Sequence, residues 1–219
     1  MLRDVSPFSD YVDTTFLIIV GISSIVLIGL MIAMIFFLVR YSRKKNPHPS
    51  NIEGSVPLEI TWTVIPLILF MGMFYLGWQG YLKEITIPAG AHPIKVTARM
   101  WAWSFEYPNG VKTDTLYVPI NAPMKLAFHS LDVNHSFYIP AFRIKKDVIP
   151  NRENVMWFQT PRAASYDIAC AEYCGLNHSY MYTKVVAKDS LDFEKWYREI
   201  SIKQSKSYTP MLTPIVGKD

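Results

Sequence analysis

Residues 170–181 read Cys-Ala-Glu-Tyr-Cys-Gly-Leu-Asn-His-Ser-Tyr-Met, which places two thiols, an imidazole and a thioether in one short segment. A second imidazole, His135, lies upstream in the sequence Asp-Val-Asn-His-Ser-Phe at residues 132–137. Soft sulfur ligands combined with imidazole nitrogen favour copper. The two segments therefore predict a metal site that is assembled from separate parts of the chain.

Four arrangements fit these side chains. A mononuclear blue-copper site takes one Cys, two His and a weak axial Met, which leaves Cys170 unused. A tetrahedral zinc site could take Cys170, Cys174, His135 and His178. A Cys170–Cys174 disulfide is the default for two cysteines outside the cytoplasm. It would not explain the spacing of the two histidines and Met181. The spacing favours two copper ions that share both thiolates, with one His each and with Met181 and a backbone carbonyl as weak axial ligands.

Both segments resemble subunit II of haem-copper oxidases of the cytochrome c oxidase type, which carries the dinuclear copper centre CuA. The resemblance lies in the pattern Cys-x-Glu-x-Cys-Gly-x-x-His-x-x-Met and in Asp-Val-x-His-Ser-Phe. It implies that Glu172 offers its main-chain carbonyl to copper and its carboxylate to a magnesium ion shared with the catalytic subunit, since oxygen suits that hard ion. The implied side-chain copper ligands are His135, Cys170, Cys174, His178 and Met181.

The same resemblance implies a function in respiration. The chain would accept single electrons from cytochrome c, soluble or membrane-tethered, and pass them to a haem of catalytic subunit I, which reduces O2 and pumps protons. Its partners would be that subunit and the other oxidase subunits. Two rivals are a copper-free structural subunit of a quinol oxidase and a copper-delivery protein. The quinol oxidase subunit should lack the metal ligands. A copper-delivery protein would need neither Trp101 nor two membrane spans.

Two residues outside the ligand set also match the family. Trp101, in Met-Trp-Ala-Trp-Ser-Phe-Glu-Tyr at residues 100–107, resembles the tryptophan through which electrons enter, whereas Trp103 and Phe105 are expected in the core. Glu59 resembles the carboxylate at the mouth of a proton channel, although a carboxylate is equally expected at a helix N-terminus. Acidic residues near Trp101 could steer a basic donor, but nearby lysines dilute that field; the acidic positions are Glu106, Asp114, Asp132 and Asp147, and the lysines are Lys112, Lys145 and Lys146.

Two long uncharged runs, 14–39 and 60–82, predict membrane-spanning helices. At 1.5 Å per residue they reach roughly 39 Å and 34 Å, enough for a bilayer core of about 30 Å. The first run is too long for the apolar part of a signal peptide and is expected to remain in the protein. Pro66 in the second run is tolerated in a membrane helix.

The loop between the two runs carries Arg40, Arg43, Lys44 and Lys45, so the positive-inside rule places it in the cytoplasm. Both termini and the copper segment are then expected on the outer, periplasmic side of an energy-transducing membrane, most simply a bacterial inner membrane. The protein would contact membrane lipid. A net charge of only +4 gives no basic field for nucleic acid.

After residue 84, short apolar or alternating runs separated by Pro, Gly and Asn predict an all-β domain. By the resemblance, this domain is a cupredoxin-like Greek-key sandwich preceded by a two-helix transmembrane hairpin. The expected divisions are an outer N-terminal segment (1–13), transmembrane helix 1 (14–39), a basic inner loop (40–59), transmembrane helix 2 (60–82), the cupredoxin-like CuA domain (83–189), and a terminal helix and tail (190–219). The expected strands lie at 94–98, 101–107, 113–117, 124–128, 136–139, 155–159, 164–169 and 182–187, with a helix at 189–201 and an irregular tail from 203.

Overall fold

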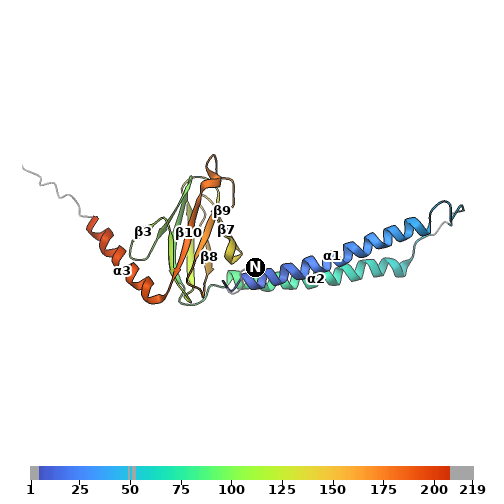
Figure 1. Cartoon of the computed structure of the whole chain (residues 1–219), viewed down its shortest axis with the longest axis horizontal. Helices are drawn as coiled ribbons and strands as arrows, with labels where there is room; N and C mark the ends of the chain where they lie inside the picture. The colour runs from blue at the N-terminus through green and yellow to red at the C-terminus, as the bar shows by residue number, and fades with distance from the viewer. Residues whose placement is uncertain (1–4, 49, 51–52, 208–219) are drawn as a thin grey trace, which may run out of the picture. The chain divides into compact units, whose positions relative to one another are not determined.

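The computed structural model describes residues 5–48, 50 and 53–207 of the chain. Its described residues divide into two compact units, one within residues 10–83 and the other formed by residues 84–207 together with residues 5–9 (Figure 1). The first unit is helical and the second contains the β-domain. The predicted order of two apolar helices followed by a β-sandwich is therefore confirmed.

The helical unit consists of α1 (Ser9–Arg40) and α2 (Val56–Ile85), which run alongside each other (Figure 1). Both are long and apolar enough to cross a membrane. Tyr11 of α1 packs on Gly80 of α2, where an added Cβ would collide with the ring, and its hydroxyl donates to the carbonyl of Leu76. Lys83 lies 4.4 Å above the same ring. The absence of a side chain at Gly80 thus leaves the space that the Tyr11 ring occupies between the two helices.

The β-domain is a sandwich of two five-stranded sheets, ordered β3-β2-β1-β5-β8 and β4-β10-β9-β6-β7. The strands of the first sheet are β1 (His92–Arg99), β2 (Ala102–Glu106), β3 (Lys112–Thr113), β5 (Met124–Ser130) and β8 (Asn154–Phe158). The strands of the second are β4 (Leu116–Pro119), β6 (His135–Ile139), β7 (Ile144–Val148), β9 (Ser165–Cys170) and β10 (Tyr182–Lys188). Short 3-10 turns follow β6 (η1, Pro140–Phe142) and precede β10 (η2, His178–Tyr180).

Alternating residues fill the space between the sheets. Trp103 and Phe105 of β2 and Phe128 of β5 point inward and are buried, as expected from the two-residue period of a strand. All three rings pack around Phe137 of β6, with ring centroids 5.2, 6.3 and 5.2 Å away respectively. The prediction that Trp103 and Phe105 are core residues is consistent with this packing. Phe137 joins the two sheets immediately beside the strand position that carries His135.

The strand predictions miss one element and merge two others. Strand β7 contains Lys145, Lys146 and Asp147 in succession, and this charged run hides the alternation that normally reveals a strand. It lies at the edge of its sheet, where charged residues are expected because they discourage further strand pairing. The expected strand at 113–117 is instead split, since β3 and β4 belong to different sheets.

The terminal helix α3 (Ser190–Ser207) extends past the expected end, so the prediction of irregular chain from residue 203 is wrong as far as 207. The remaining tail lies outside the described residues. The Gln204 side chain accepts from Lys112 N–H at 3.1 Å and donates to Lys112 O at 2.7 Å. The helix is thereby bound to the exposed edge of β3, a tertiary contact that local sequence cannot reveal.

A polar cluster fixes β7 to β6 beside His135. The buried Ser136 hydroxyl donates to Asp147 Oδ1 at 2.8 Å, and Lys145 Nζ lies 2.6 Å from the same oxygen. The hydrogen bond from Lys145, and then that from Ser136, lower the pKa of Asp147, outweighing its partial desolvation. A carboxyl group with a lowered folded-state pKa stabilises the fold above its unfolded pKa of about 4, and this contribution disappears as pH falls through the folded-state pKa.

We expect Asp147→Asn to lower the free energy of unfolding at pH 7 by up to about 1 kcal/mol, because the Asp147 side chain is 44% exposed and solvent screens its ion pair. At an acid pH below the folded-state pKa the difference from the unmodified chain should vanish, as the carboxyl is then protonated in both folded and unfolded states. Unfolding of the full chain in detergent at the two pH values measures this. Asp114→Asn is the matched control, and an equal loss at both pH values would contradict the assignment.

Candidate metal centre

The predicted ligand segments meet because their strands are neighbours. β9 lies between β6 and β10 in one sheet, so Cys170 at the end of β9 comes close to His135 at the start of β6. Two backbone hydrogen bonds close the arrangement: Ala171 N–H donates to Ser136 O at 2.8 Å, and Cys170 N–H donates to Met181 O at 3.2 Å. The ligand loop between β9 and β10 is therefore held at both ends.

The two thiols lie side by side in the interior. Their Sγ atoms are 3.8 Å apart, and the two residues are 7% and 3% exposed. A disulfide bond requires about 2.05 Å between sulfurs. Cys170 and Cys174 are thus free thiols in this structure, spaced so that both could bind the same ion or ions.

Each thiol faces a different histidine. His135 Nδ1 is 3.9 Å from Cys170 Sγ, and His178 Nδ1 is 3.5 Å from Cys174 Sγ. The donor atoms of His135, Cys170 and Cys174 all lie within 4.8 Å of one another, and His178 falls outside that set. Four donors around one tetrahedral zinc ion should gather more closely. The four donor atoms thus follow one another in the order imidazole, thiol, thiol, imidazole.

Two weaker donors each lie near a different thiol. Met181 is fully buried, and its Sδ is 3.7 Å from Cys174 Sγ. The carbonyl oxygen of Glu172 is 3.3 Å from Cys170 Sγ. The structure therefore brings all six sequence-predicted copper ligands together. The carboxylate of Glu172 is on an exposed residue, outside the metal-ligand group that the described residues form.

Asp132 holds one histidine in the orientation and tautomer that a metal needs. Its Oδ1 is 2.8 Å from His135 Nε2, and its carboxylate also accepts the backbone N–H groups of Met100 and Val133. An ionised carboxylate only accepts hydrogen bonds, so Nε2 carries the proton and the Nδ1 lone pair faces Cys170. From the sequence, Asp132 was expected in the Asp-Val-x-His-Ser-Phe segment and among the acidic residues near Trp101, with no role at the metal. Its position three residues before His135 was the available signal.

The charge state of the site follows from burial. Desolvation, followed by the neighbouring Cys170, raises the pKa of Cys174 to about 12, so its thiol is protonated at neutral pH without a metal. For Asp132, partial burial acts to raise the pKa, but the hydrogen bonds from Met100, His135 and Val133 lower it below its usual value. A bound cation would have to displace the thiol proton beside a carboxylate that is already ionised.

Two tryptophans contact the site from β2 and the turn before it. The half-buried Trp101 donates its indole N–H to Cys174 O at 3.2 Å. Gly175 follows with φ +113°, and a Cβ there would lie 3.3 Å from the indole nitrogen. Trp103 donates to Met181 O at 3.4 Å, and its ring meets that of His135 edge-on at 6.1 Å. The contact of Trp103 with the site was not predicted from the sequence, which assigned Trp103 only to the core.

The outer face of the ligand loop is apolar and open to solvent. Tyr173, Leu176 and Tyr180 are 76%, 86% and 80% exposed, and they lie in the same loop as the half-buried His178. The Tyr173 ring lies 5.8 Å from that of His178. His135 by contrast is fully buried. One histidine of the pair is therefore accessible from outside and the other is not.

The remaining predicted residues lie elsewhere. Glu59 is in the first turn of α2, in the helical unit. Of the acidic residues near Trp101, Asp132 binds His135, Asp147 binds Lys145 and Glu106 lies 3.5 Å from Lys112. Much of their charge is thus engaged within this chain.

Comparison with known proteins identifies the family. The model for the transmembrane domain of cytochrome c oxidase subunit II matches residues 3–76, and the model for its periplasmic domain matches residues 110–188. Together they cover well over half of the chain. This chain belongs to the cytochrome c oxidase subunit II family. It is accordingly a membrane protein with two transmembrane helices and an outer domain.

Individual subunit II relatives agree with this. The chain is 31% identical over 195 residues to cytochrome c oxidase subunit 2 of Alkalihalophilus pseudofirmus, covering 84% of this chain and 57% of the relative. The periplasmic domain of subunit II (CoxB) of Bradyrhizobium japonicum is 27% identical, with a TM-score of 0.52 over 54% of this chain and 99% of that domain. The cupredoxin-like fold expected of a subunit II is thereby confirmed.

A further solved structure captures a subunit II periplasmic domain in a mixed disulfide with a thioredoxin-like protein, TlpAs. That domain is 27% identical to this subunit II, with a TM-score of 0.50 over 55% of this chain and 97% of that chain.

We expect Asp132→Ala to weaken metal binding by this subunit II about 10- to 100-fold, because His135 loses the acceptor that fixes its tautomer. Asp132→Asn keeps an acceptor oxygen and should lose less. Copper titration of the full chain against a chromophoric chelator measures both. Asp114→Ala removes an exposed carboxylate near the same domain end and should leave affinity unchanged; an equal loss in all three variants would exclude the role given to Asp132.

Proposed function

We propose that this chain is the electron-entry subunit of a respiratory cytochrome c oxidase, which takes single electrons from cytochrome c and passes them to a haem of the catalytic subunit. The observation that carries the proposal is the row of four donor atoms, His135 Nδ1, Cys170 Sγ, Cys174 Sγ and His178 Nδ1, with neighbours 3.5 to 3.9 Å apart. It supports a dinuclear copper centre, which these four residues would hold.

The donor set fits copper in its chemistry as well as its spacing. Thiolate, imidazole and thioether are soft or intermediate ligands, which suit copper. When bound, a dinuclear copper centre accepts and releases one electron at a time. The chain's own contribution is to hold these ligands in place: β6, β9 and β10 fix their backbones, and Asp132 fixes His135. A site that need not rearrange when its charge changes has a low barrier to electron transfer, as in other preorganised sites.

Trp101 is proposed as the point of electron entry. It is half-buried, so part of its ring is open to a partner, and its N–H is bonded to the carbonyl of the ligand Cys174. This gives a short route from the surface to the metal centre. Because three nearby carboxylates are engaged within the chain, a donor held by its own membrane anchor or by the complex suits this surface as well as a strongly basic soluble cytochrome c.

The exposed face around His178 is proposed as the side on which electrons leave. Tyr173, Leu176 and Tyr180 make an apolar surface that catalytic subunit I would cover. Glu172, exposed beside them, would share a magnesium ion with that subunit. Glu59, in the first turn of α2, would lie at the mouth of a proton channel in the same complex. The O2-reducing site would be in the partner, so this chain alone would exchange electrons without reducing oxygen.

The proposed orientation follows from the basic loop between the helices. Arg40 ends α1, and Arg43, Lys44 and Lys45 follow before α2 begins, which favours a cytoplasmic loop. The β-domain and both termini would then lie outside, in the periplasm of a bacterium, where a cytochrome c donor can reach Trp101. A copper-free structural subunit of a quinol oxidase is the alternative, but it would leave the buried thiol pair unused.

Metal analysis of the full chain tests this function. We expect two copper ions per chain after loading, and less than one in Cys170→Ser or Cys174→Ser, since each ion requires both thiolates. Ser179→Ala, in the same loop, is the control and should keep both ions. No copper binding after loading would favour the quinol oxidase alternative, and a single ion or zinc alone would overturn the dinuclear centre.

We propose as a second activity that a disulfide between Cys170 and Cys174 in the metal-free chain is reduced, before metal loading, by the dithiol of a thioredoxin-like protein, which is itself oxidised to a disulfide. The Sγ–Sγ distance of 3.8 Å is short enough for a small local movement to join the sulfurs, and a related subunit II domain forms such a mixed disulfide. In oxidised, metal-free chain, a thioredoxin-like protein lacking its resolving cysteine should form a covalent complex, detectable by non-reducing electrophoresis. Copper-loaded chain should form none, because its thiolates are engaged; equal trapping in both states would refute the exchange.

A further inference from the structure

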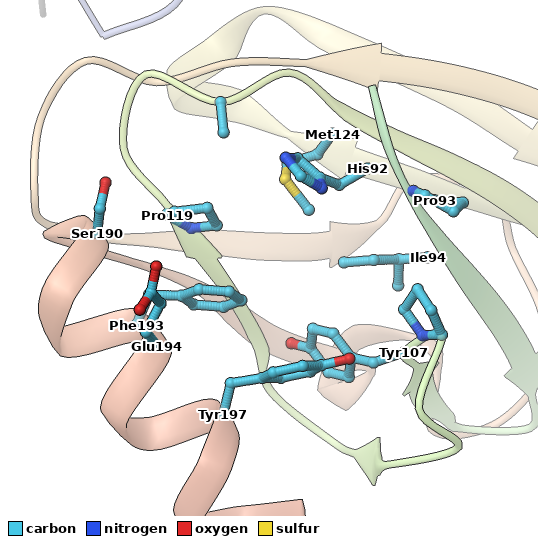
Figure 2. Close-up of a pocket in the computed structure, with 12 residues that line it drawn as sticks. His92, Pro93, Ile94, Tyr107, Pro119, Met124, Ser190, Phe193, Glu194 and Tyr197 are labelled. Atoms are coloured by element: carbon cyan, nitrogen blue, oxygen red, sulfur yellow. The ribbon is translucent and has the colours of Figure 1, made fainter. Parts of the chain in front are cut away.

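A second site lies against the terminal helix and shares no residue with the proposed copper ligands. It is a cavity of about 360 Å³ between the start of α3 and the β-domain (Figure 2). Phe193 and Tyr197 of α3 form one side, and Tyr107, Ile94 and Met124 of the β-domain form the other. Its volume is within the range of small-molecule sites, which are typically apolar with a few polar groups.

Three aromatic rings define the shape of this cavity. The rings of Phe193 and Tyr197 are nearly parallel, at 17° and 5.7 Å, whereas Tyr107 stands at 63° to Tyr197 with centroids 5.8 Å apart. Figure 2 shows the two helix residues extending from α3 toward Tyr107. The Tyr107 hydroxyl is already used, since it donates to Tyr117 O and accepts from Tyr117 N–H. Tyr107 therefore offers a ligand its ring rather than a free phenol.

The charge of the lining selects against anions. Glu194 is the acidic residue among the described residues that line the cavity, and none of those residues is Lys or Arg. Three other cavities of this β-domain each include basic residues, namely Arg99 and Lys112, Lys95 and Lys125, and Lys145, Lys146 and Arg152. Its aromatic walls and single carboxylate distinguish this cavity from the other three, in a chain whose net charge is +4.

One neighbouring group bears on the charge of Glu194. Arg198 lies on the next turn of α3, 3.4 Å from its carboxylate, but both side chains are exposed, by 78% and 62%. An exposed pair of this kind contributes at most about 1 kcal/mol, so a bound cation can compete for the carboxylate. His92 lines the opposite side of the cavity, next to Met124 (Figure 2).

We propose that this cavity binds the quaternary ammonium group of a small organic cation. Aromatic ring faces attract a soft, weakly hydrated cation, and this is how cages of aromatic residues recognise choline-like groups. A nearby carboxylate adds charge complementarity, and the volume leaves space for a substituent beyond the trimethylammonium group. The same group could come from a free solute such as choline or from the head group of phosphatidylcholine.

The decisive comparison uses choline and 3,3-dimethylbutan-1-ol, a neutral molecule of the same shape. Ligand-observed NMR or calorimetry on the full chain, in a maltoside detergent without choline groups, would measure both affinities. We expect choline to bind at least about fivefold more tightly, from its attraction to the ring faces and to Glu194. Equal affinity would overturn the proposal, because the cavity would then select shape and apolarity alone. This comparison needs no substitution and cannot be confused with misfolding.

Variants then locate the site. Phe193→Leu and Tyr197→Leu should each weaken choline binding about tenfold while leaving the neutral analogue nearly unaffected. Glu194→Gln should weaken choline by about threefold, and Arg198→Gln should strengthen it by removing a competing cation. Leu191→Ala is the control, since Leu191 is 82% exposed on the same helix and does not line the cavity. Unchanged choline binding in both aromatic variants would place the cation elsewhere and refute the site.

Choline binding by the full chain in lipid nanodiscs distinguishes a free solute from the head group of phosphatidylcholine. If phosphatidylcholine lipids abolish binding of free choline relative to discs of phosphatidylglycerol alone, the occupant is a lipid head group. If choline binds equally in both kinds of disc, the occupant of the cavity is a free solute. Either result supports the cation site, whereas absence of choline binding in discs and in detergent refutes it.

Discussion

The pairing register of β6 with β9 is the constraint on which the metal centre depends. Phe137 lies opposite Cys170, and Tyr138 lies opposite Ala169. Since side chains alternate between the faces of a strand, a slip of one residue would turn Cys170 toward the opposite face. Phe137, fixed among three core rings, holds this register from inside the sandwich. The hydrophobic core thus sets which sulfur and which imidazole can meet.

Around that register, the site is built from contacts of different kinds. Backbone hydrogen bonds fix the ends of the ligand loop, a carboxylate orients the buried histidine, and two indole N–H groups hold the carbonyls of Cys174 and Met181. Gly175 is required where the loop passes Trp101, because a side chain would enter the space of the indole. The ligands are therefore supported on several sides, while His178 is the one histidine or cysteine ligand that is not buried.

Sequence patterns could predict the parts of this protein whose chemistry is local. The uncharged runs 14–39 and 60–82 predict membrane-spanning helices. The spacing of Cys170, Cys174, His178 and Met181 predicts a shared metal site. The parts that depend on distant contacts could not be read in this way. Strand β7 is hidden by its charges, and the end of α3 is fixed by Lys112, far away in the chain. Asp132 carried a signal in its distance from His135, but its role becomes visible only when the hydrogen bond is seen.

The position of α3 has a consequence for handling the β-domain by itself. Trp196 lies 4.3 Å from the ring of Tyr117 and 5.6 Å from that of Tyr107, so the helix shields aromatic surface beside β4. A shortened polypeptide that stopped at Lys188 would uncover these rings and the edge of β3 together. Exposed apolar surface next to an unpaired strand promotes self-association. Soluble fragments of the outer domain should therefore retain the chain through Ser207, with any affinity tag attached beyond it.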